Sequence, residues 1–212
     1  MVRGRFITFE GGEGAGKSTQ VRLLAESLKA RDGEVVVTRE PGGADGAEAI
    51  RALLVSGAVN RWDGCTEALL HSAARRDHLV KTVWPALARG AWVICDRFAD
   101  STLAYQGYGH GLDHGLIRQL ASVTMGVFRP DLTLILDLPV AEGLKRAGGR
   151  GGAEDRYERM GRAFHQRLRQ GFLDIAAAEP DRCAVIDATQ PVEAVGAAIR
   201  DIVAARLDGG MA

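Results

Sequence analysis

The stretch with the clearest chemical potential is a glycine-rich loop that ends in a lysine and a serine. Its spacing is Gly11-x-x-x-x-Gly16-Lys17-Ser18, between an apolar run and a helical pattern. This is the phosphate-binding loop pattern in its strand–loop–helix context. Glycines let backbone N–H groups close around phosphate oxygens, and the helix N-terminus adds positive charge. The predicted nucleotide-binding segment is Gly11, Gly12, Glu13, Gly14, Ala15, Gly16, Lys17, Ser18 and Thr19.

Two of these side chains have specific roles in the pattern: Lys17 reaches the outer phosphates, and the Ser18 hydroxyl lies on Mg²⁺. A carboxylate for the same ion is predicted at Asp96, which follows the apolar run 92–95 and stands before Arg97. In such nucleotide enzymes, an acidic residue at a strand end contacts the metal or its water shell. An Asp–Arg pair that only caps the strand is the alternative.

The elements that must position these groups alternate along the chain. Short apolar runs at 6–10, 34–38, 92–95, 132–137 and 184–186 are separated by longer helical patterns. This alternation predicts an α/β fold with a parallel sheet and helices on both faces. Helices are expected at 17–31, 44–56, 66–89, 112–125 and 140–147. A last helix is expected with Asp187 or Thr189 as its cap and Pro191 in its first turn. Ligands of open parallel sheets bind at the carboxyl edge of the strands.

Two loops are expected at that edge. The segment 39–43, Arg-Glu-Pro-Gly-Gly, holds a turn after the second strand. The segment 101–111 is rich in glycine and tyrosine, and we interpret it as a loop or helix end that packs on a flat ligand. A plain surface loop is the alternative.

The segment 148–152 contains four glycines in five positions and cannot form a stable element. It carries Arg150, and Arg156 follows shortly after. A mobile lid at about 147–158 would exclude water and bring these arginines onto a transferring phosphoryl group. A surface loop with solvated charges is the alternative. The prediction is one domain over 1–212 with this lid.

Composition limits the other classes. The 212 residues carry 27 Lys and Arg against 27 Asp and Glu, so no broad basic face for nucleic acid is expected. Cys65, Cys95 and Cys183 form no CxxC pair and are interpreted as buried thiols in a reducing compartment. We find no signal peptide and no apolar run of membrane length. The predicted location is the cytoplasm.

Several separated motifs occur in order: FEGxEGAGKST from Phe9, TREPGG from Thr38, AAR from Ala73, Asp96-Arg97, STxAYQG from Ser101 and DATQP from Asp187. Over about residues 5–200 the chain resembles the thymidylate kinase family, particularly the bacterial form. The loop alone is shared by many families, whereas the ordered set is specific.

That resemblance implies a nucleoside-monophosphate-kinase fold with a five-stranded parallel sheet, usually a homodimer. It implies transfer of the γ-phosphoryl group of ATP to dTMP with Mg²⁺, in dTTP synthesis. Small molecules are then the expected substrates, with no nucleic-acid or membrane partner. The implied dTMP-binding residues are Glu13, Arg39, Pro41, His71, Arg75, Arg97, Ser101, Tyr105 and Gln106; those around adenine are Arg146, Asp187 and Thr189.

The implied roles are specific. Arg39 and Arg97 hold the dTMP phosphate, Arg75 binds the thymine edge, and Tyr105 packs by the deoxyribose and disfavours a ribose hydroxyl. Glu13 meets the sugar hydroxyl. Catalysis is expected from Lys17, Arg97, Arg150 and Arg156, which counter phosphate charge. The nucleophile is already an acidic phosphate oxygen, so no general base is assigned.

Two positions bear on this resemblance. Gly14 stands where some members of the family carry an arginine; members without it have the catalytic arginine in the lid, and Arg150 fits that type. His71 stands where a phenylalanine commonly stacks on thymine, and an imidazole offers less area and a titratable edge.

Two other functions stay open from the residues alone. One is a kinase that prefers dUMP or dCMP, because a methyl group is worth only about 1–3 kcal/mol in an apolar pocket. The other is a non-catalytic ATP-binding module, which would have no monophosphate pocket.

Overall fold

The computed structural model describes residues 4–148 and 155–208. Within these residues five parallel strands form one sheet in the order β2-β3-β1-β4-β5. They are β1 (Phe6–Glu10), β2 (Val35–Arg39), β3 (Trp92–Asp96), β4 (Leu132–Asp137) and β5 (Cys183–Asp187). The predicted fold class is confirmed. The predicted strand boundaries differ by only one residue at an end, or not at all, because β-branched and apolar runs mark buried strands well.

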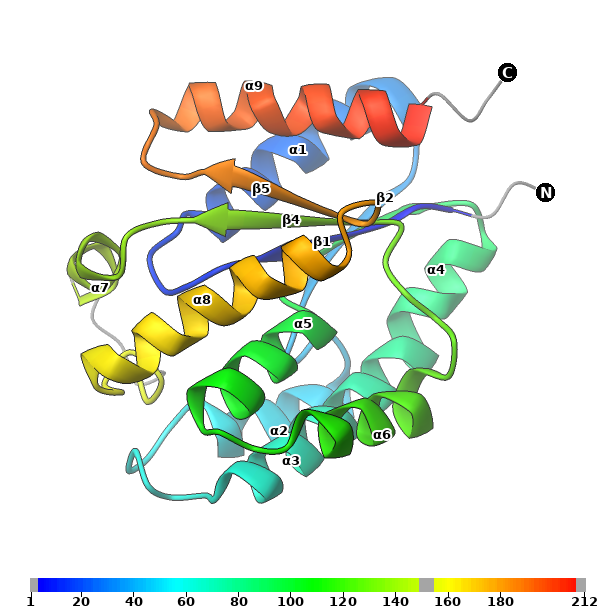
Figure 1. The fold of residues 1–212 in the computed structure, drawn as a ribbon. Coiled ribbons are helices and arrows are strands. Elements are labelled where there is room, and N and C mark those ends of the chain that lie inside the picture. Colours follow the sequence, from blue (N-terminus) through cyan, green and yellow to red (C-terminus); the bar gives the residue numbers. More distant parts are fainter. Residues whose placement is uncertain (1–3, 149–154, 209–212) are drawn as a thin grey trace.

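Helices cover both faces of the sheet (Figure 1). One face carries α1 (Lys17–Asp32) and α9 (Val192–Val203), and the other is covered by α8 (Arg162–Ala178) and the helices of the middle of the chain. The remaining helical elements are α2 (Asp45–Leu54), α3 (Gly64–His78), η1 (Leu79–Val83), α4 (Trp84–Ala88), α5 (Ala99–Thr102), η2 (Leu103–Gly109), α6 (His114–Met125), α7 (Val140–Gly148) and η3 (Ala204–Asp208).

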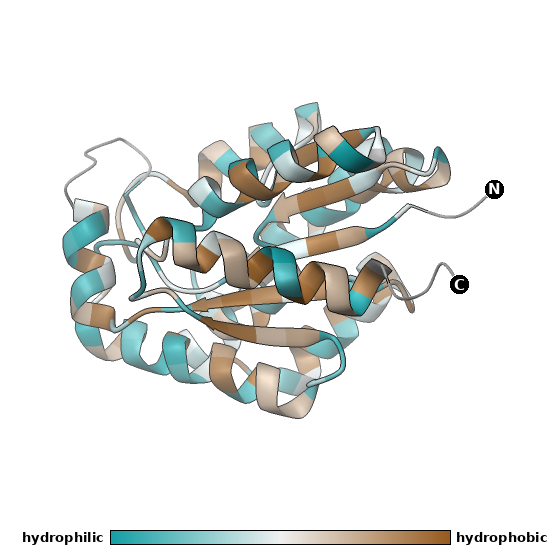
Figure 2. Cartoon of the chain, turned by 90° about the horizontal axis from the view of Figure 1, so that it is seen from above, coloured by the Kyte–Doolittle hydropathy of each residue, from teal (hydrophilic) through white to brown (hydrophobic). Residues whose placement is uncertain are grey.

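The alternation of side chains along β1 divides the core into two layers. Ile7 and Phe9 pack with buried residues of α1 and α9, whereas Phe6 faces α4 and η1 on the other side. The apolar colour in Figure 2 follows the strands and the inner faces of the helices. This double burial holds the sheet rigid, so residues at the strand ends have fixed positions.

The strands end together and bring polar residues to one edge. Phe9 of β1 pairs with Asp96 of β3, and Arg39 of β2 pairs with the same Asp96. On the other side, Asp137 of β4 pairs with Asp187 of β5. The carboxyl edge of the sheet therefore presents the charged groups that the motifs predicted there.

The segment 101–111, predicted as a loop or helix end, is mostly helical, in α5 and η2, because Tyr105, Gln106 and Ala104 are buried against neighbouring helices. The alternative of a plain surface loop is wrong. Tertiary packing here overrides the glycines. The last helix is not capped by a side chain: Pro191 is its N-cap residue, and Asp187 instead accepts the Thr189 N–H within the preceding turn.

Among the described residues, no helix is long and apolar enough to cross a membrane.

Candidate active site

The phosphate loop joins β1 to α1 and has the backbone that its glycines predict. Gly11, Gly14 and Gly16 have positive φ angles, a region that favours glycine. A Cβ on Gly14 would also lie 2.1 Å from the carbonyl oxygen of Gly143 in α7. An arginine at position 14 is thus excluded by this backbone, which agrees with its absence from the sequence.

Lys17 lies at the start of α1 and turns back across the loop. Its Nζ donates hydrogen bonds to the carbonyl oxygens of Gly11, at 3.1 Å, and Gly12, at 2.8 Å. Burial and repulsion from Arg97 lower the pKa of Lys17 to about 8. A bound phosphate would favour the charged form, since an opposite charge nearby raises the pKa of an amine.

The Ser18 hydroxyl donates to Asp96 Oδ2 over 2.7 Å. This contact joins the loop to the end of β3. Hydroxyl and carboxylate oxygens are the hard ligands that Mg²⁺ takes, and that ion commonly keeps waters and substrate phosphates in its remaining positions. Ser18 and Asp96 therefore fit a magnesium site that ATP completes.

Arg97 is held over the loop from the other side. It is the only described residue other than glycine with a positive φ, at 69°. Its guanidinium donates to the Gly11 carbonyl at 2.9 Å and to Glu13 Oε1 at 3.1 Å. Such a backbone costs energy and persists where surrounding contacts hold it. Here Glu10 supplies those contacts by accepting from the N–H of Phe98 and from Ser101.

Glu13 connects the phosphate loop to the predicted sugar site. It accepts from Arg97 and, at 2.5 Å, from the Tyr105 hydroxyl. Burial by itself would raise its pKa, but Arg97 and Lys17 outweigh that effect and lower the pKa of Glu13 to about 2. Its carboxylate is thus ionised and offers acceptors to a sugar hydroxyl.

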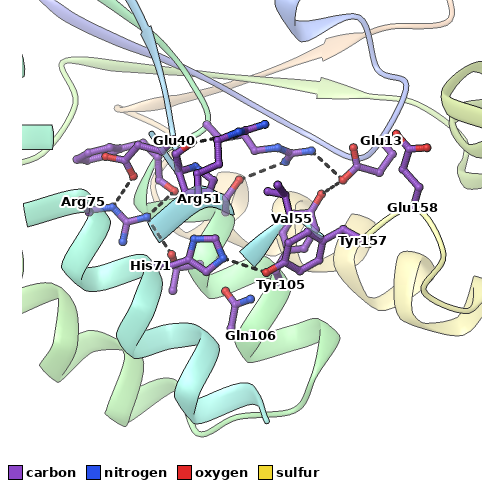
Figure 3. A pocket seen from close by; sticks show the side chains of 15 residues that line it. Glu13, Glu40, Arg51, Val55, His71, Arg75, Tyr105, Gln106, Tyr157 and Glu158 are labelled. Atoms are coloured by element: carbon purple, nitrogen blue, oxygen red, sulfur yellow. Dashed lines mark hydrogen bonds and ion pairs between the residues drawn. The ribbon is translucent and has the colours of Figure 1, made fainter. Parts of the chain in front are cut away.

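A cavity opens beside these groups, on the side of α3 and η2 (Figure 3). Most of the predicted dTMP-binding residues line it: Glu13, Pro41, His71, Arg75, Arg97, Ser101, Tyr105 and Gln106. Arg39 lies instead in a second cavity, with Lys17, Ser18, Asp96 and Arg97. Glu13, Glu40, Arg51 and Arg97 line both cavities, so the two adjoin.

Arg75 enters the first cavity from α3 and is fixed by buried contacts. Its Nε donates to Glu40 Oε2 at 2.8 Å, and its Nη2 donates to the Phe98 carbonyl and to Thr102. Glu40 Oε1 in turn forms a hydrogen bond with His78 Nδ1 over 2.9 Å. A guanidinium held in this way is a rigid donor for a planar ligand.

His71 lies in the wall of the first cavity. Burial and the nearby charge of Arg75 lower its pKa to about 4, so the imidazole is neutral near pH 7. Its Nε2 lies 3.1 Å from the Tyr157 hydroxyl. The titratable edge expected from the sequence is therefore not charged at that pH.

The prediction for Arg156 needs correction. Its side chain is fully buried and donates to the carbonyl oxygens of Leu54, Ala58 and Val59 and to Glu67. With these partners it does not reach the phosphate loop, because Glu67 of α3 supplies the buried counter-charge. Arg150, the other predicted lid arginine, lies outside the described residues.

The predicted adenine residues lie together at the far side of the loop. Arg146 of α7 is exposed and donates to the Ala188 carbonyl at 3.4 Å. Asp187 accepts from Thr189 in the same turn. Thr19 is exposed on α1. The structure therefore brings Arg146 close to the 187–189 turn, as the resemblance implied.

Five lining or supporting residues were missed: Glu10, Glu40, Arg51, Glu67 and Tyr157. A signal existed for one of them, because Glu10 ends β1, a strand buried along its whole length, and a buried carboxylate needs a partner. Burial and the charge of Asp100 raise the pKa of Glu10. Glu67 had no such signal, because it lies in a helix with mixed faces.

Comparison with known proteins agrees with this geometry. The family model described as thymidylate kinase matches residues 9–199. Thymidylate kinase of Caulobacter vibrioides is 60% identical over 207 residues, covering 98% of this chain and 99% of that protein. Thymidylate kinase of Nitrobacter hamburgensis is 53% identical over 201 residues, with 94% and 87% covered.

A solved structure is similar as well. The crystal structure of thymidylate kinase from Ehrlichia chaffeensis superposes with a TM-score of 0.78 at 40% identity, covering 95% of this chain and 99% of that one. The phosphate loop, the arginine-lined cavity beside it and these relatives lead to one conclusion: the chain belongs to the thymidylate kinase family.

Proposed function

We propose that the two adjoining cavities receive two nucleotides whose phosphate groups meet above the carboxyl edge of the sheet. This proposal depends on the position of Arg97. Arg97 lines both cavities, and its guanidinium donates to the Gly11 carbonyl in the phosphate loop. A guanidinium in this position can donate hydrogen bonds both to ATP and to the monophosphate that accepts the phosphoryl group.

The reaction is that of the family: the chain phosphorylates dTMP to dTDP with ATP, a step of dTTP synthesis. Phosphoryl transfer depends mainly on positioning and charge neutralisation. In the proposed assignment Lys17 and Arg97 act on the transferring group, and Arg39 binds the acceptor phosphate together with Arg97. The acceptor oxygen is already acidic, so this assignment includes no general base.

The base of dTMP lies in the first cavity in this proposal. Arg75 donates to the O4 edge, His71 packs on the ring, and Gln106, Ser101 and Pro41 surround it. Tyr105 and Glu13 lie at the sugar. The hydrogen bond from Tyr105 to Glu13 fixes both groups before the ligand binds, which reduces the ordering cost of binding.

ATP is assigned to the phosphate loop, with the adenine between Arg146 and the turn of Asp187 and Thr189. Mg²⁺ is assigned to the Ser18 hydroxyl and, through water, to Asp96. A magnesium ion there neutralises charge on the outer phosphates. The predicted lid at about 147–158, with Arg150 as its catalytic arginine, is part of this proposal; residues 149–154 lie outside those described.

A coupled assay of ADP release tests the assignment. Mg²⁺-ATP is supplied with dTMP, dUMP, dCMP or no monophosphate. Rapid turnover with dTMP is the expected result. Faster turnover with dUMP or dCMP would support the alternative kinase, and slow ATP loss that ignores the monophosphate would support a nucleotide-binding module. Arg39, Arg75 and Arg97 would then have no common ligand.

A homodimer is proposed on a second observation. Leu69 of α3, Val80 of η1 and Val123 of α6 are exposed apolar side chains, and Val123 is 85% exposed. The helices α3 and α6 pack together away from α1 and α9 (Figure 1). An exposed apolar surface on neighbouring helices is typical of a protein–protein contact.

Light scattering with size-exclusion chromatography tests the dimer. The expected mass is twice the chain mass of 22.6 kDa. Val123→Glu should shift the protein toward the monomer. Val192→Glu changes an exposed valine on α9, in the opposite layer, and should leave the mass unchanged. A monomeric wild-type protein at micromolar concentration would contradict the dimer. The cytoplasmic location stays a prediction.

A further inference from the structure

Glu67 of α3 is a buried carboxylate to which the reaction above gives no role. Its Oε1 accepts a hydrogen bond from Arg156. Its Oε2 accepts from Gln106 Nε2, at 3.0 Å, and from the Tyr157 hydroxyl, at 3.3 Å. His110 Nε2 lies 3.4 Å from the same Oε2. Two of these partners, Gln106 and Tyr157, line the cavity assigned to the base. Glu67 therefore lies directly behind the wall of that cavity.

The carboxylate of Glu67 is ionised in the folded protein. Burial would raise its pKa, but hydrogen bonds from His110 and Arg156 outweigh burial and lower the pKa to about 2. An ionised carboxylate only accepts hydrogen bonds. Every partner of Glu67 must therefore donate to it, which determines the orientation of each partner.

The first consequence concerns the Gln106 amide. Its NH₂ group must face Glu67, so its Oε1 faces the other way. Gln106 is fully buried, and Oε1 has no hydrogen-bond partner among the described residues. A buried acceptor without a partner is costly and usually marks a ligand or water position. Because Gln106 lines the base cavity, Oε1 is an acceptor without a partner at the wall of that cavity.

The second consequence concerns Tyr157 and His71. The Tyr157 hydroxyl has one proton, and it donates this proton in its hydrogen bond to Glu67 Oε2. The oxygen of Tyr157 must then accept from His71 Nε2 across 3.1 Å. His71 is therefore in the tautomer that carries its proton on Nε2. Figure 3 shows His71, Tyr157 and Gln106 together at one side of the cavity.

Arg75 completes the pattern as a donor, since a guanidinium has no acceptor. The wall thus presents a donor at Arg75 and an acceptor at Gln106 Oε1. A pyrimidine with O4 and N3–H matches this pair, because O4 accepts and N3–H donates. Cytosine has the opposite pattern, with a donor amino group and an acceptor N3.

We infer that Glu67 is a positioning residue that sets the hydrogen-bond polarity of the base cavity and thereby selects pyrimidines with N3–H and O4 over cytosine. This inference rests on the proposed assignment of the base to that cavity. It does not involve the phosphate loop or the metal.

Glu67→Gln gives a sharp test. Arg156 can only donate, so it claims the new carbonyl oxygen, and the new NH₂ group faces Gln106 and Tyr157. The Gln106 amide then turns and presents NH₂ in place of Oε1. We expect the ratio of kcat/KM for dTMP to that for dCMP to fall by about tenfold to a hundredfold. The ratio of dTMP to dUMP should change by less than about twofold, because both carry N3–H and O4.

These ratios are insensitive to a loss of folded protein, which scales all rates together. An unchanged dTMP to dCMP ratio would overturn the inference. A wild-type protein that phosphorylates no pyrimidine monophosphate would instead overturn the proposed function.

A second measurement starts from the wild-type protein. Nitrogen-15 NMR of histidine-labelled wild-type protein, with His71 assigned from the His71→Phe variant, should show the proton on Nε2. A proton on Nδ1 would mean that Tyr157 donates to His71, and the inference would then be wrong. In folded Glu67→Gln protein the proton should move to Nδ1.

Discussion

The Ser18 hydroxyl donates to Asp96 Oδ2 over 2.7 Å, although 78 positions separate the two residues in the sequence. Neither residue makes a magnesium site by itself. The parallel pairing of β1 with β3 places the phosphate loop beside the end of β3, so the two oxygens meet. This pair links the local motif to the sheet.

Asp96→Asn should raise the Mg²⁺ concentration needed for half-maximal turnover and lower kcat. The amide keeps the shape of the side chain but loses the charge that the proposed site uses to hold the metal and its water shell. Turnover is measured against Mg²⁺ concentration at saturating ATP and dTMP. Asp201→Asn, at an exposed position of α9, is the control and should match the wild type. An unchanged Mg²⁺ response in Asp96→Asn would remove Asp96 from the site.

Lys17→Ala should lower kcat by about 10²–10³-fold, since the transferring phosphoryl group loses a charged donor. The fold should persist, because Lys17 contacts only loop carbonyl oxygens as a donor. Steady-state turnover and thermal melting measure the two effects. Lys29→Ala, at an exposed position of the same helix, should keep full activity. Near-wild-type turnover of folded Lys17→Ala would refute the role of Lys17.

Arg156→Ala should lower the free energy of unfolding by about 3–5 kcal/mol, because it leaves the buried charge of Glu67 without its guanidinium partner. Urea unfolding measures the change. The matched control is Arg159→Ala, which breaks an exposed pair with Asp155 and a hydrogen bond to the Gly57 carbonyl and should cost at most about 2 kcal/mol. Equal losses of unfolding free energy in the two variants would show that the buried Arg156–Glu67 pair stabilises the protein no more than an exposed pair does.

His71 should make the protein less stable in mild acid. Its pKa is lowered from 6.5 to about 4 in the folded state, first by burial and then by Arg75. Between pH 4 and 6.5 the unfolded chain binds the proton and the native protein does not, so the stability from this group falls as pH decreases through that window. His71→Phe removes this effect.

Melting temperatures of the wild type and His71→Phe at pH 5 and pH 7.5 test this directly. The melting temperature of His71→Phe minus that of the wild type should be larger at pH 5 than at pH 7.5. A difference between the two proteins that does not depend on pH would contradict the low pKa of His71.

The phosphate loop and the sheet could be predicted because their signals are local. The loop lies within Gly11 to Ser18, and its glycines are required by backbone angles and by the approach of Gly143. The central strands β1, β3 and β4 were found because strands buried on both faces are apolar runs. The edge strands β2 and β5 keep Val37 and Val185 exposed and were found from their short apolar runs alone. The motifs, taken in their order along the chain, then indicated the family. The sequence left 101–111 open between a loop and a helix end, because the packing partners that stabilise Tyr105 and Gln106 are distant in the sequence.

The sequence by itself determined the phosphate chemistry, since eight consecutive positions define the loop and the helix behind it. Only the tertiary structure decided the partners of the buried charges. Arg156 could serve a phosphate or a carboxylate, and the packing of its segment against α2 and α3 placed it on Glu67, 89 positions away. The physical reason is that a buried ion needs a counter-charge, and the fold, rather than spacing along the chain, determines which one lies within reach.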